Sequence, residues 1–252
     1  MIYISSPKKF TLTDADFDAV INYATTNGYT LPTKSKLLLL LISRLKQIGV
    51  WQKLDVFYVF SGDGDSDFKC INLIDPAAFF GTKSGGLTWS NLGVKGNGTD
   101  GYIDSGYTPS INAVERKLEN AGTFGVMANV GDVLWGTNSS DDRFQNVLSA
   151  NTKRLDGPFT TVVSATAAGF VGIMRDSGTT GRFISKSDVT NISGSTNDLT
   201  ARVNLLLRSG MLYGTTQLSC WGTGAALTET EVLNFRNAFN NYLIKIGESP
   251  IA

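Results

Sequence analysis

Three aspartates near residue 65 are the side chains of this sequence best suited to hold a metal ion. Asp63, Asp65 and Asp67 stand at alternate positions, the spacing with which a calcium-binding EF-hand loop begins. Phe68 occupies the position where that loop needs a glycine, and Ile74 the position of its bidentate glutamate, so a complete EF-hand is excluded. Two interpretations stay open: a looser calcium site formed by the three aspartates, and an acidic turn exposed to solvent.

A tryptophan followed by a polar run has the residue types that bind carbohydrate. An indole ring covers the apolar face of a sugar, while amide and carboxylate groups pair with the sugar hydroxyl groups. Trp135 precedes Asn138 and Asp141 in a segment of loop-like composition, and these three residues are the predicted ligand-binding set. The alternative interpretation is core packing beside a turn. Other pairings of an aromatic ring with a polar side chain occur at Trp89 with Asn91 and at Tyr107 with Asp104.

The composition argues against the commonest catalytic centres, and we expect no enzymatic activity. The sequence contains no histidine, which removes every Ser-His-Asp and Cys-His nucleophile and every histidine metal ligand. The glutamates form no E-x-D-x-E strand of the kind that some glycosidases use. Lysine plus arginine and aspartate plus glutamate both number 22, so the chain lacks the basic excess expected of a nucleic-acid-binding protein. The cysteines, Cys70 and Cys220, permit one disulfide but do not indicate it.

Residues 96–101, with the sequence GNGTDG, match the glycine pattern of dinucleotide-binding loops. That chemistry requires the glycines to lie between a strand and the N-terminus of a helix. The following residues, 102–104, are strand-like instead. The motif therefore predicts a glycine-rich turn between strands.

Three helices are predicted from apolar spacing and from end signals. Residues 13–49 form a helical hairpin in which Thr13 and Asp16 begin the first helix and Gly28 ends it. The second helix begins near Thr33 and ends at Gly49, and its apolar run at 37–42 is too short to cross a membrane. Near the C-terminus, a capping box of Thr228 and Glu231 precedes a helix that ends at Gly247. No cleaved leader is expected, because no positive segment precedes an apolar stretch at the start.

Between these helices the sequence is typical of short antiparallel strands. The chain has 27 glycines in 252 residues, and turn-rich linkers separate the apolar runs. In the first run, residues 54, 56, 58 and 60 are expected on one face and residues 57 and 59 on the other. The predicted strands are 54–60, 123–129, 144–149, 159–166, 170–175, 182–186, 203–208 and 217–221. We therefore expect a mainly β fold, an antiparallel sandwich with an N-terminal helical hairpin and a C-terminal helix.

Three segments carry a resemblance to a known group of proteins. They are residues 49–58 (GVWQKLDVFY), residues 95–104 (KGNGTDGYID) and residues 225–231 (AALTETE). Their order resembles bacteriophage virion proteins that contain a concanavalin A-like or laminin-G-like jelly roll, as in crAss-like and related tailed phages. The resemblance spans roughly residues 30 to 247. It implies an attachment or oligomerisation segment at 1–50 and a concanavalin A-like sandwich with its C-terminal helix at 51–252.

The resemblance also implies a function. We expect a virion structural protein, a fibre or surface appendage of head or tail, that displays a lectin-like module for adhesion to host-surface glycans. One alternative is an architectural virion module without a ligand, and a second is a polysaccharide-degrading enzyme. The expected partners are other virion proteins, further copies of this chain and a host glycan, with no nucleic acid and no insertion into membrane. The expected location is the virion surface, after synthesis in the host cytoplasm. No cofactor is expected beyond the calcium ion considered for Asp63, Asp65 and Asp67.

Overall fold

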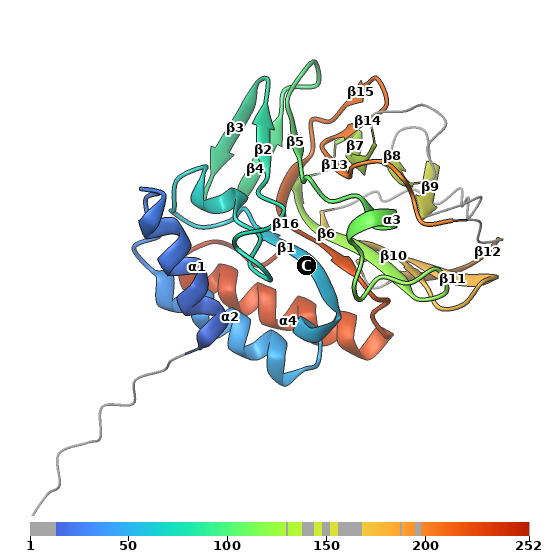
Figure 1. Cartoon of the computed structure of the whole chain (residues 1–252), viewed down its shortest axis with the longest axis horizontal. Coiled ribbons are helices and arrows are strands. Elements are labelled where there is room, and N and C mark those ends of the chain that lie inside the picture. The colour runs from blue at the N-terminus through green and yellow to red at the C-terminus, as the bar shows by residue number, and fades with distance from the viewer. Residues whose placement is uncertain are drawn as a thin grey trace, which may run out of the picture.

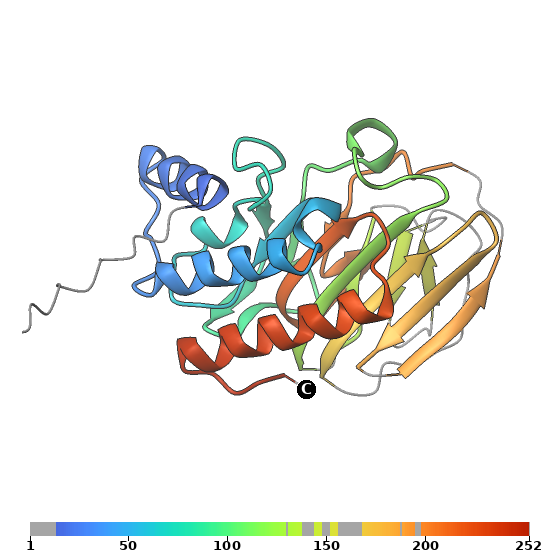
Figure 2. The same ribbon diagram turned by 90° about the horizontal axis from the view of Figure 1, so that it is seen from below.

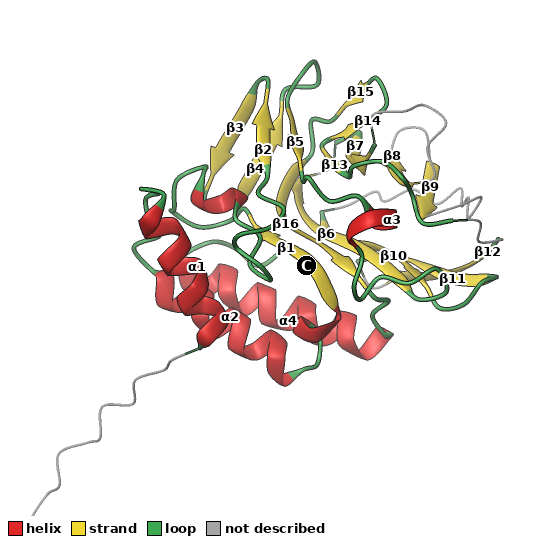
Figure 3. Cartoon of the chain, in the orientation of Figure 1, coloured by secondary structure: helices red, strands yellow, loops and turns green. Residues whose placement is uncertain are grey.

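The three longer helices lie on one side of the molecule, and the strands lie on the other together with one short helix (Figure 3). The computed structural model describes residues 14–129, 131–137, 144–147, 152–155, 168–186, 188–194 and 198–251. In this part of the chain a helical layer covers one face of a large antiparallel sheet, and a smaller sheet packs on the opposite face. The expected mainly β sandwich with N-terminal helices and a C-terminal helix is confirmed. Within the described ranges no helix has both the length and the hydropathy needed to span a bilayer.

The larger sheet lies at the centre of the molecule. Its strand order is β12-β11-β10-β6-β16-β4-β3, and β1 also pairs with β16. Every pairing in this sheet is antiparallel. The bounds are β1 Leu54–Val59, β3 Leu87–Ser90, β4 Gly93–Gly96, β6 Ala121–Asn129, β10 Gly169–Arg175, β11 Thr180–Ser185, β12 Asp188–Ser193 and β16 Gln217–Gly224.

The smaller sheet has the order β2-β5-β13-β7-β8-β9, and a separate two-stranded hairpin, β14-β15, follows β13 along the chain. All of these strands span only two to four residues, which is too short for an alternating pattern to be recognised in the sequence. The bounds are β2 Thr82–Ser84, β5 Tyr102–Asp104, β7 Val133–Gly136, β8 Phe144–Val147, β9 Thr152–Leu155, β13 Leu205–Leu206, β14 Arg208–Ser209 and β15 Leu212–Tyr213.

The predicted strands agree best with the larger sheet. Those at 54–60, 123–129, 170–175, 182–186 and 217–221 correspond to β1, β6, β10, β11 and β16. The strand predicted at 144–149 corresponds to β8, whereas the one predicted at 203–208 is divided between β13 and β14. The strand predicted at 159–166 lies outside the described residues. Residues 102–104, expected to be strand-like, form β5, whereas strands β2 to β4, β7, β9, β12 and β15 were not predicted.

Strand β1 separates the two hydrophobic clusters of the molecule. Phe57 and Val59 belong to the cluster under the helices, and Val56, Tyr58 and Phe60 to the cluster between the sheets. This alternation is the predicted one, except at residue 54. Leu54 was expected beside Val56, yet it packs under the helices, because the register of β1 on β16 shifts between residues 54 and 56. A bulge of this kind reverses the face of every residue before it.

Three longer helices form the layer over the larger sheet. Helices α2 and α4 lie side by side across the sheet, and α1 lies at one end of the layer (Figure 2). Their buried apolar residues share one cluster with the outer face of the sheet. The bounds are α1 Ala15–Thr26, α2 Ser35–Gln47 and α4 Glu229–Ile246, with a short helix α3 at Pro109–Asn112 and 3-10 turns at Trp51–Lys53 and Phe68–Cys70.

The helix ends agree in part with the predicted signals. The capping box of Thr228 and Glu231 is formed, and Gly247 ends α4 in the left-handed conformation at φ 100°. The cap predicted for α1 is wrong. Asp14 caps this helix through its side chain, which accepts hydrogen bonds from the backbone of Asp16 and Phe17. An acidic side chain directly before the first turn satisfies the free N–H groups there, and Thr13 lies outside the described residues.

Candidate ligand-binding surface

Two tyrosines and an arginine form a half-buried cluster on the sheet side of the molecule, away from the helical layer. Tyr102 lies on β5, Arg208 on β14 and Tyr213 on β15, and these strands lie at the top of Figure 1, opposite α2 and α4. The guanidinium carbon of Arg208 is 4.7 Å from the ring centroid of Tyr102 and 5.1 Å from that of Tyr213. The two ring centroids are 6.2 Å apart. The cation is therefore held against two aromatic rings.

The GNGTDG motif forms the turn that presents Tyr102. Strand β4 ends at the first glycine of the motif and β5 begins directly after the last. The Asn97 side-chain oxygen accepts hydrogen bonds from the backbone N–H groups of Thr99, Asp100 and Gly101. The predicted glycine-rich turn is confirmed, and its backbone donors are occupied by this asparagine.

A residue in the left-handed conformation directs Arg208 onto the tyrosines. Leu207 has a φ of 63°, which is strained for a branched apolar residue. Its buried side chain lies between the sheets, and its backbone N–H donates to the carbonyl of Leu134. The core contact thus holds the bend between β13 and β14.

The segment that carries Tyr102 and the segment that carries Tyr213 approach each other closely at glycine positions. A Cβ atom on Gly96 would lie 2.3 Å from the carbonyl oxygen of Gly214, and a Cβ atom on Gly136 would lie 2.4 Å from the Cβ atom of Ser209. Distances this short exclude any side chain at either glycine. The close backbone approach therefore places the motif turn, β7 and the β14-β15 hairpin together, which brings Tyr102 and Tyr213 into one cluster.

The cluster retains unused hydrogen-bonding groups. Arg208 Nε donates to the carbonyl of Gly210 at 3.1 Å, whereas its two terminal nitrogens have no partner among the described residues. The phenolic hydroxyl groups of Tyr102 and Tyr213 likewise have none within the described part of the chain. Met211, 89% exposed, lies at the tip of the same hairpin. Apolar surface beside unpaired donors is the combination that carbohydrate recognition requires.

Comparison with known proteins gives sheet-rich structures of low similarity. No protein-family model matches the chain, and no curated protein matches it. Among solved structures it is similar to a Trypanosoma rangeli sialidase, with 10% identity, a TM-score of 0.43, and coverage of 81% of this chain and 39% of the sialidase. It is also similar to the binding domain of botulinum neurotoxin DC in complex with SialylT, with 9% identity, a TM-score of 0.44, and coverage of 75% and 52%.

A third similar structure is domain 4 of AbnA, an extracellular arabinanase from Geobacillus stearothermophilus, in complex with arabinotriose. Its identity is 11%, its TM-score 0.42, and the coverage is 73% of this chain and 98% of that domain. The chain thus spans less than two thirds of the sialidase and toxin chains that it matches.

The prediction that the Trp135 ring forms a carbohydrate platform is wrong. Trp135 lies on β7 with 0% exposure and belongs to the cluster between the sheets. A fully buried indole presents no ring face to a ligand, so Trp135 is a core residue in this structure. Asn138 and Asp141 lie outside the described residues, and their predicted role is untested.

The two other aromatic positions also pack into the protein. Tyr107 is fully buried, and its hydroxyl donates to the Asp55 carboxylate at 2.8 Å. Trp89 is half-buried and contacts Phe60 edge to face, while the Lys69 ammonium lies 6.0 Å from its ring centroid. The buried Tyr107 ring is therefore closed to ligands, and the Trp89 ring is covered in part by Phe60 and Lys69.

The three aspartates of the predicted calcium site bind protein groups instead of meeting at one point. Asp63 accepts from the Thr33 hydroxyl, and Asp65 accepts from the backbone N–H of Thr30 at 2.6 Å. Asp67 pairs with the Lys83 ammonium at 2.9 Å. No group of three candidate metal ligands occurs in the described ranges. The calcium interpretation is therefore not supported, and the loop connects the helical hairpin to the sandwich.

The ionised Asp65 carboxylate in this loop is expected to make the folded state less stable in acid. Burial opposes ionisation of Asp65, but hydrogen bonds from the backbone of Phe68 and Thr30 outweigh it and lower its pKa below the ordinary value. A lowered folded-state pKa stabilises the fold above the unfolded-state value, and this contribution is lost as pH falls through the folded-state value. We expect the melting temperature to fall between pH 5 and pH 3, and to fall less in Asp65→Asn. The exposed Asp188→Asn is the matched control, and equal pH dependence in all three proteins would contradict the assignment.

Neither cysteine is available for nucleophilic chemistry. Cys70 and Cys220 are both free and buried, so the disulfide that the sequence permitted is not formed. Burial raises the pKa of Cys70 to about 12 and raises that of Cys220 further. Both thiols are protonated near neutral pH, and they act as small apolar core residues.

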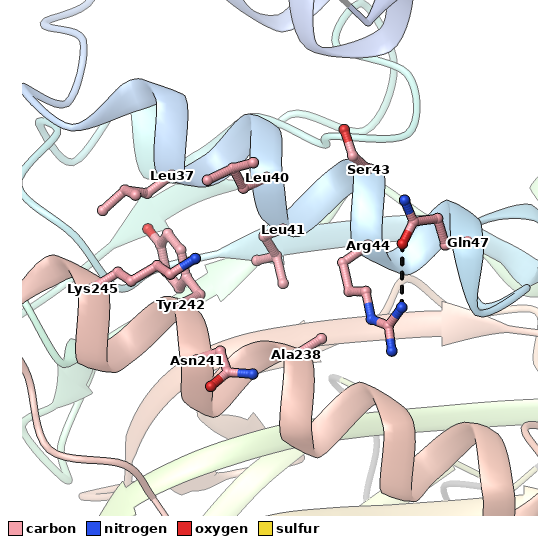
Figure 4. Close-up of a pocket in the computed structure, with 10 residues that line it drawn as sticks. All are labelled: Leu37, Leu40, Leu41, Ser43, Arg44, Gln47, Ala238, Asn241, Tyr242 and Lys245. Carbon is pink, nitrogen blue, oxygen red and sulfur yellow. Dashed lines mark hydrogen bonds between the residues drawn. The ribbon is translucent and has the colours of Figure 1, made fainter. Parts of the chain in front are cut away.

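A second surface lies between α2 and α4 on the helical side (Figure 4). It is a groove of about 360 Å³. Its floor is apolar, and Leu40 contributes a side chain that is 41% exposed. The cations Arg44 and Lys245 stand on opposite walls (Figure 4). The lining residues are Leu37, Leu40, Leu41, Ser43, Arg44, Gln47, Ala238, Asn241, Tyr242 and Lys245, and none of them is acidic.

Sequence reasoning missed the tyrosine and arginine cluster because its parts are distant in the chain. Residues 208–213 read RSGMLY, with a glycine at the centre and apolar residues at what becomes an exposed tip. Apolar residues at a turn are a local signal of a binding loop. Their partner Tyr102 follows the glycine motif, and no local pattern shows that the two segments meet.

Proposed function

We propose that this chain is a carbohydrate-binding β-sandwich whose ligand surface is the cluster of Tyr102, Arg208 and Tyr213. The observation that supports it is the presence on one surface of two half-buried aromatic rings, with phenolic hydroxyl groups and guanidinium donors that have no partner among the residues the structure describes. Aromatic rings contact the apolar side of a sugar, and the donors bind its hydroxyl groups. The proposed role is binding without turnover.

A glycan array tests this function. The parent protein should retain a subset of glycans, and Tyr213→Ala should bind them about tenfold more weakly, because one aromatic contact is lost. Ile111→Ala, at a residue 78% exposed on α3, is the control and should bind like the parent. Retention of no glycan would exclude carbohydrate binding, and cleavage of a bound polysaccharide would favour an enzyme.

We further propose that the chain is displayed on a bacteriophage particle, as a fibre or surface appendage of head or tail. Support comes from the resemblance of residues 49–58, 95–104 and 225–231 to phage virion proteins. Weak sites gain avidity when many copies act together on one particle, which suits adhesion to a glycan-covered host. Antibody labelling of purified particles tests the location, and absence of the chain from particles would exclude it.

The groove between α2 and α4 favours a second role, attachment to another protein of the particle. Its leucine floor suits the apolar face of a helix. Its charged lining residues, Arg44 and Lys245, are both cationic, so the complementary partner is an amphipathic helix with acidic residues beside its apolar face. A second copy of the same groove would bring like charges together, so we propose a different protein as the partner.

Incorporation into particles tests this attachment. Leu40→Glu should fold yet be lost from purified particles, because a carboxylate in the groove repels an acidic helix and removes apolar contact. Leu233→Glu, at an exposed position elsewhere on α4, is the matched control and should be incorporated normally. Equal incorporation of both variants would exclude the groove as the attachment surface.

A further inference from the structure

We propose that Arg208 makes the ligand surface selective for sugars that carry a carboxylate, such as uronic or sialic acids. This inference rests on the proposed carbohydrate-binding function and assigns the class of sugar. It depends on the orientation of one guanidinium group, on the absence of an acidic partner for it in the described part of the chain, and on the aromatic groups beside it.

The orientation of the Arg208 guanidinium is fixed before any ligand binds. Two tyrosine rings flank it at 4.7 and 5.1 Å, and its Nε donates to the carbonyl of Gly210. The planar group then directs its remaining N–H donors away from this internal hydrogen bond. A guanidinium matches a carboxylate through two parallel hydrogen bonds, and a group already held in place loses little freedom on binding.

No carboxylate among the described residues pairs with the Arg208 guanidinium. Arg182, another half-buried arginine, forms an ion pair with Asp176 at 2.6 Å. Lys46 and Lys53 are likewise paired with carboxylates. Within the described part of the chain Arg208 has no such partner, although it too is half-buried. A partly dehydrated cation without an anion favours an anionic ligand.

The groups beside the cation favour a sugar over a simple anion. Tyr102 and Tyr213 add ring surface and unpaired hydroxyl groups, and Leu212, next to Tyr213, is 50% exposed. An inorganic anion would accept hydrogen bonds from the guanidinium and the hydroxyl groups, but it would leave the ring surface uncovered. The carboxylate of an acidic sugar would pair with Arg208, while the sugar ring and its hydroxyl groups would contact the two tyrosines. Such a ligand would contact the guanidinium, the aromatic rings and the phenolic hydroxyl groups together.

Direct binding of single sugars to the full chain tests the inference. The probes are N-acetylneuraminic acid, glucuronic acid, the neutral sugars galactose and glucose, and galactose 6-sulfate, each titrated at low ionic strength by NMR or calorimetry. The parent should bind at least one carboxylate sugar about tenfold more tightly than either neutral sugar, and added salt should weaken this binding. Arg208→Gln should remove the preference, whereas Arg208→Lys should retain part of it because the charge remains.

Controls separate this inference from the proposed function. Lys36→Gln removes an exposed cation of α2 that lies outside both proposed surfaces and should bind like the parent, and an unchanged melting temperature of Arg208→Gln shows that the fold is intact. Equal binding of neutral and acidic sugars, still weakened by Tyr213→Ala, would overturn the carboxylate preference and leave carbohydrate binding in place. An unchanged preference in Arg208→Gln would overturn the assignment to Arg208. Binding of galactose 6-sulfate as tight as that of the carboxylate sugars would overturn the assignment to carboxylates. No binding of any sugar would overturn both proposals.

Discussion

Replacing Asp55 with alanine is expected to lower the free energy of unfolding by about 3 to 5 kcal/mol. The Asp55 carboxylate is 8% exposed and accepts four hydrogen bonds. Their donors are the Tyr107 hydroxyl at 2.8 Å and the backbone N–H groups of Val114, Glu115 and Arg116 at 3.0, 2.7 and 3.0 Å. Alanine would leave these buried or half-buried donors without an acceptor, and each carries a desolvation penalty.

The loss of stability should be large because Asp55 stabilises two separate parts of the fold. It occupies the bulge where the register of β1 on β16 shifts, and its carboxylate holds the segment that leads into β6. Urea unfolding measures the loss. Asp55→Asn should lose less, because an amide oxygen still accepts two of the bonds. Asp75→Ala, at an exposed carboxylate, is the control, and a loss below about 1 kcal/mol in Asp55→Ala would contradict this role.

The elements with local signals could be predicted from the sequence. Helix α4 has a capping box at one end and a glycine at the other, with apolar residues at helical spacing between them. Strand β1 is a continuous apolar run with both faces buried. In both cases neighbouring residues determine the structure, so a pattern of a few residues is sufficient.

Features that depend on distant contacts could not be predicted in this way. The bulge at Asp55 requires partners from residues 107 to 116, and the placement of Leu54 follows from it. Trp135 lies in a polar context in the sequence, yet β7 is the strand that pairs with β13 inside the sandwich. The ligand surface requires Gly96 and Gly214 to meet. Each case depends on which strands are neighbours in space, and local spacing does not contain that information.

The arrangement of layers separates the two proposed surfaces. The groove between α2 and α4 is on the helical side, and the cluster of Tyr102, Arg208 and Tyr213 is on the opposite, sheet side (Figure 1). A protein attached through its helices would therefore present the ligand surface outward. Variants in one surface should leave the function of the other unchanged, which makes the two proposals independent in experiment.

Replacing Phe235 with alanine is expected to lower the free energy of unfolding by about 3 to 5 kcal/mol. Phe235 is fully buried on α4, and its ring centroid lies 4.9 Å from that of Phe124, 5.9 Å from that of Phe170 and 6.0 Å from that of Phe57. These partners come from three strands of the larger sheet, so the cavity would open between helix and sheet. Leu233→Ala, at a side chain 53% exposed on the same helix, is the control and should change stability by less than about 1 kcal/mol.

The same variant tests whether the helical layer is a separate domain. Phe17, Leu41 and Phe235 belong to one buried cluster with Phe57 and Phe124 of the sheet. Because this core is shared, α1, α2 and the sandwich should unfold together. Far-UV circular dichroism and tryptophan fluorescence should therefore give coincident unfolding curves in the parent, and both curves should shift equally in Phe235→Ala. Two separate transitions, with only the helical signal shifted, would show instead that the helical layer unfolds independently of the sheets.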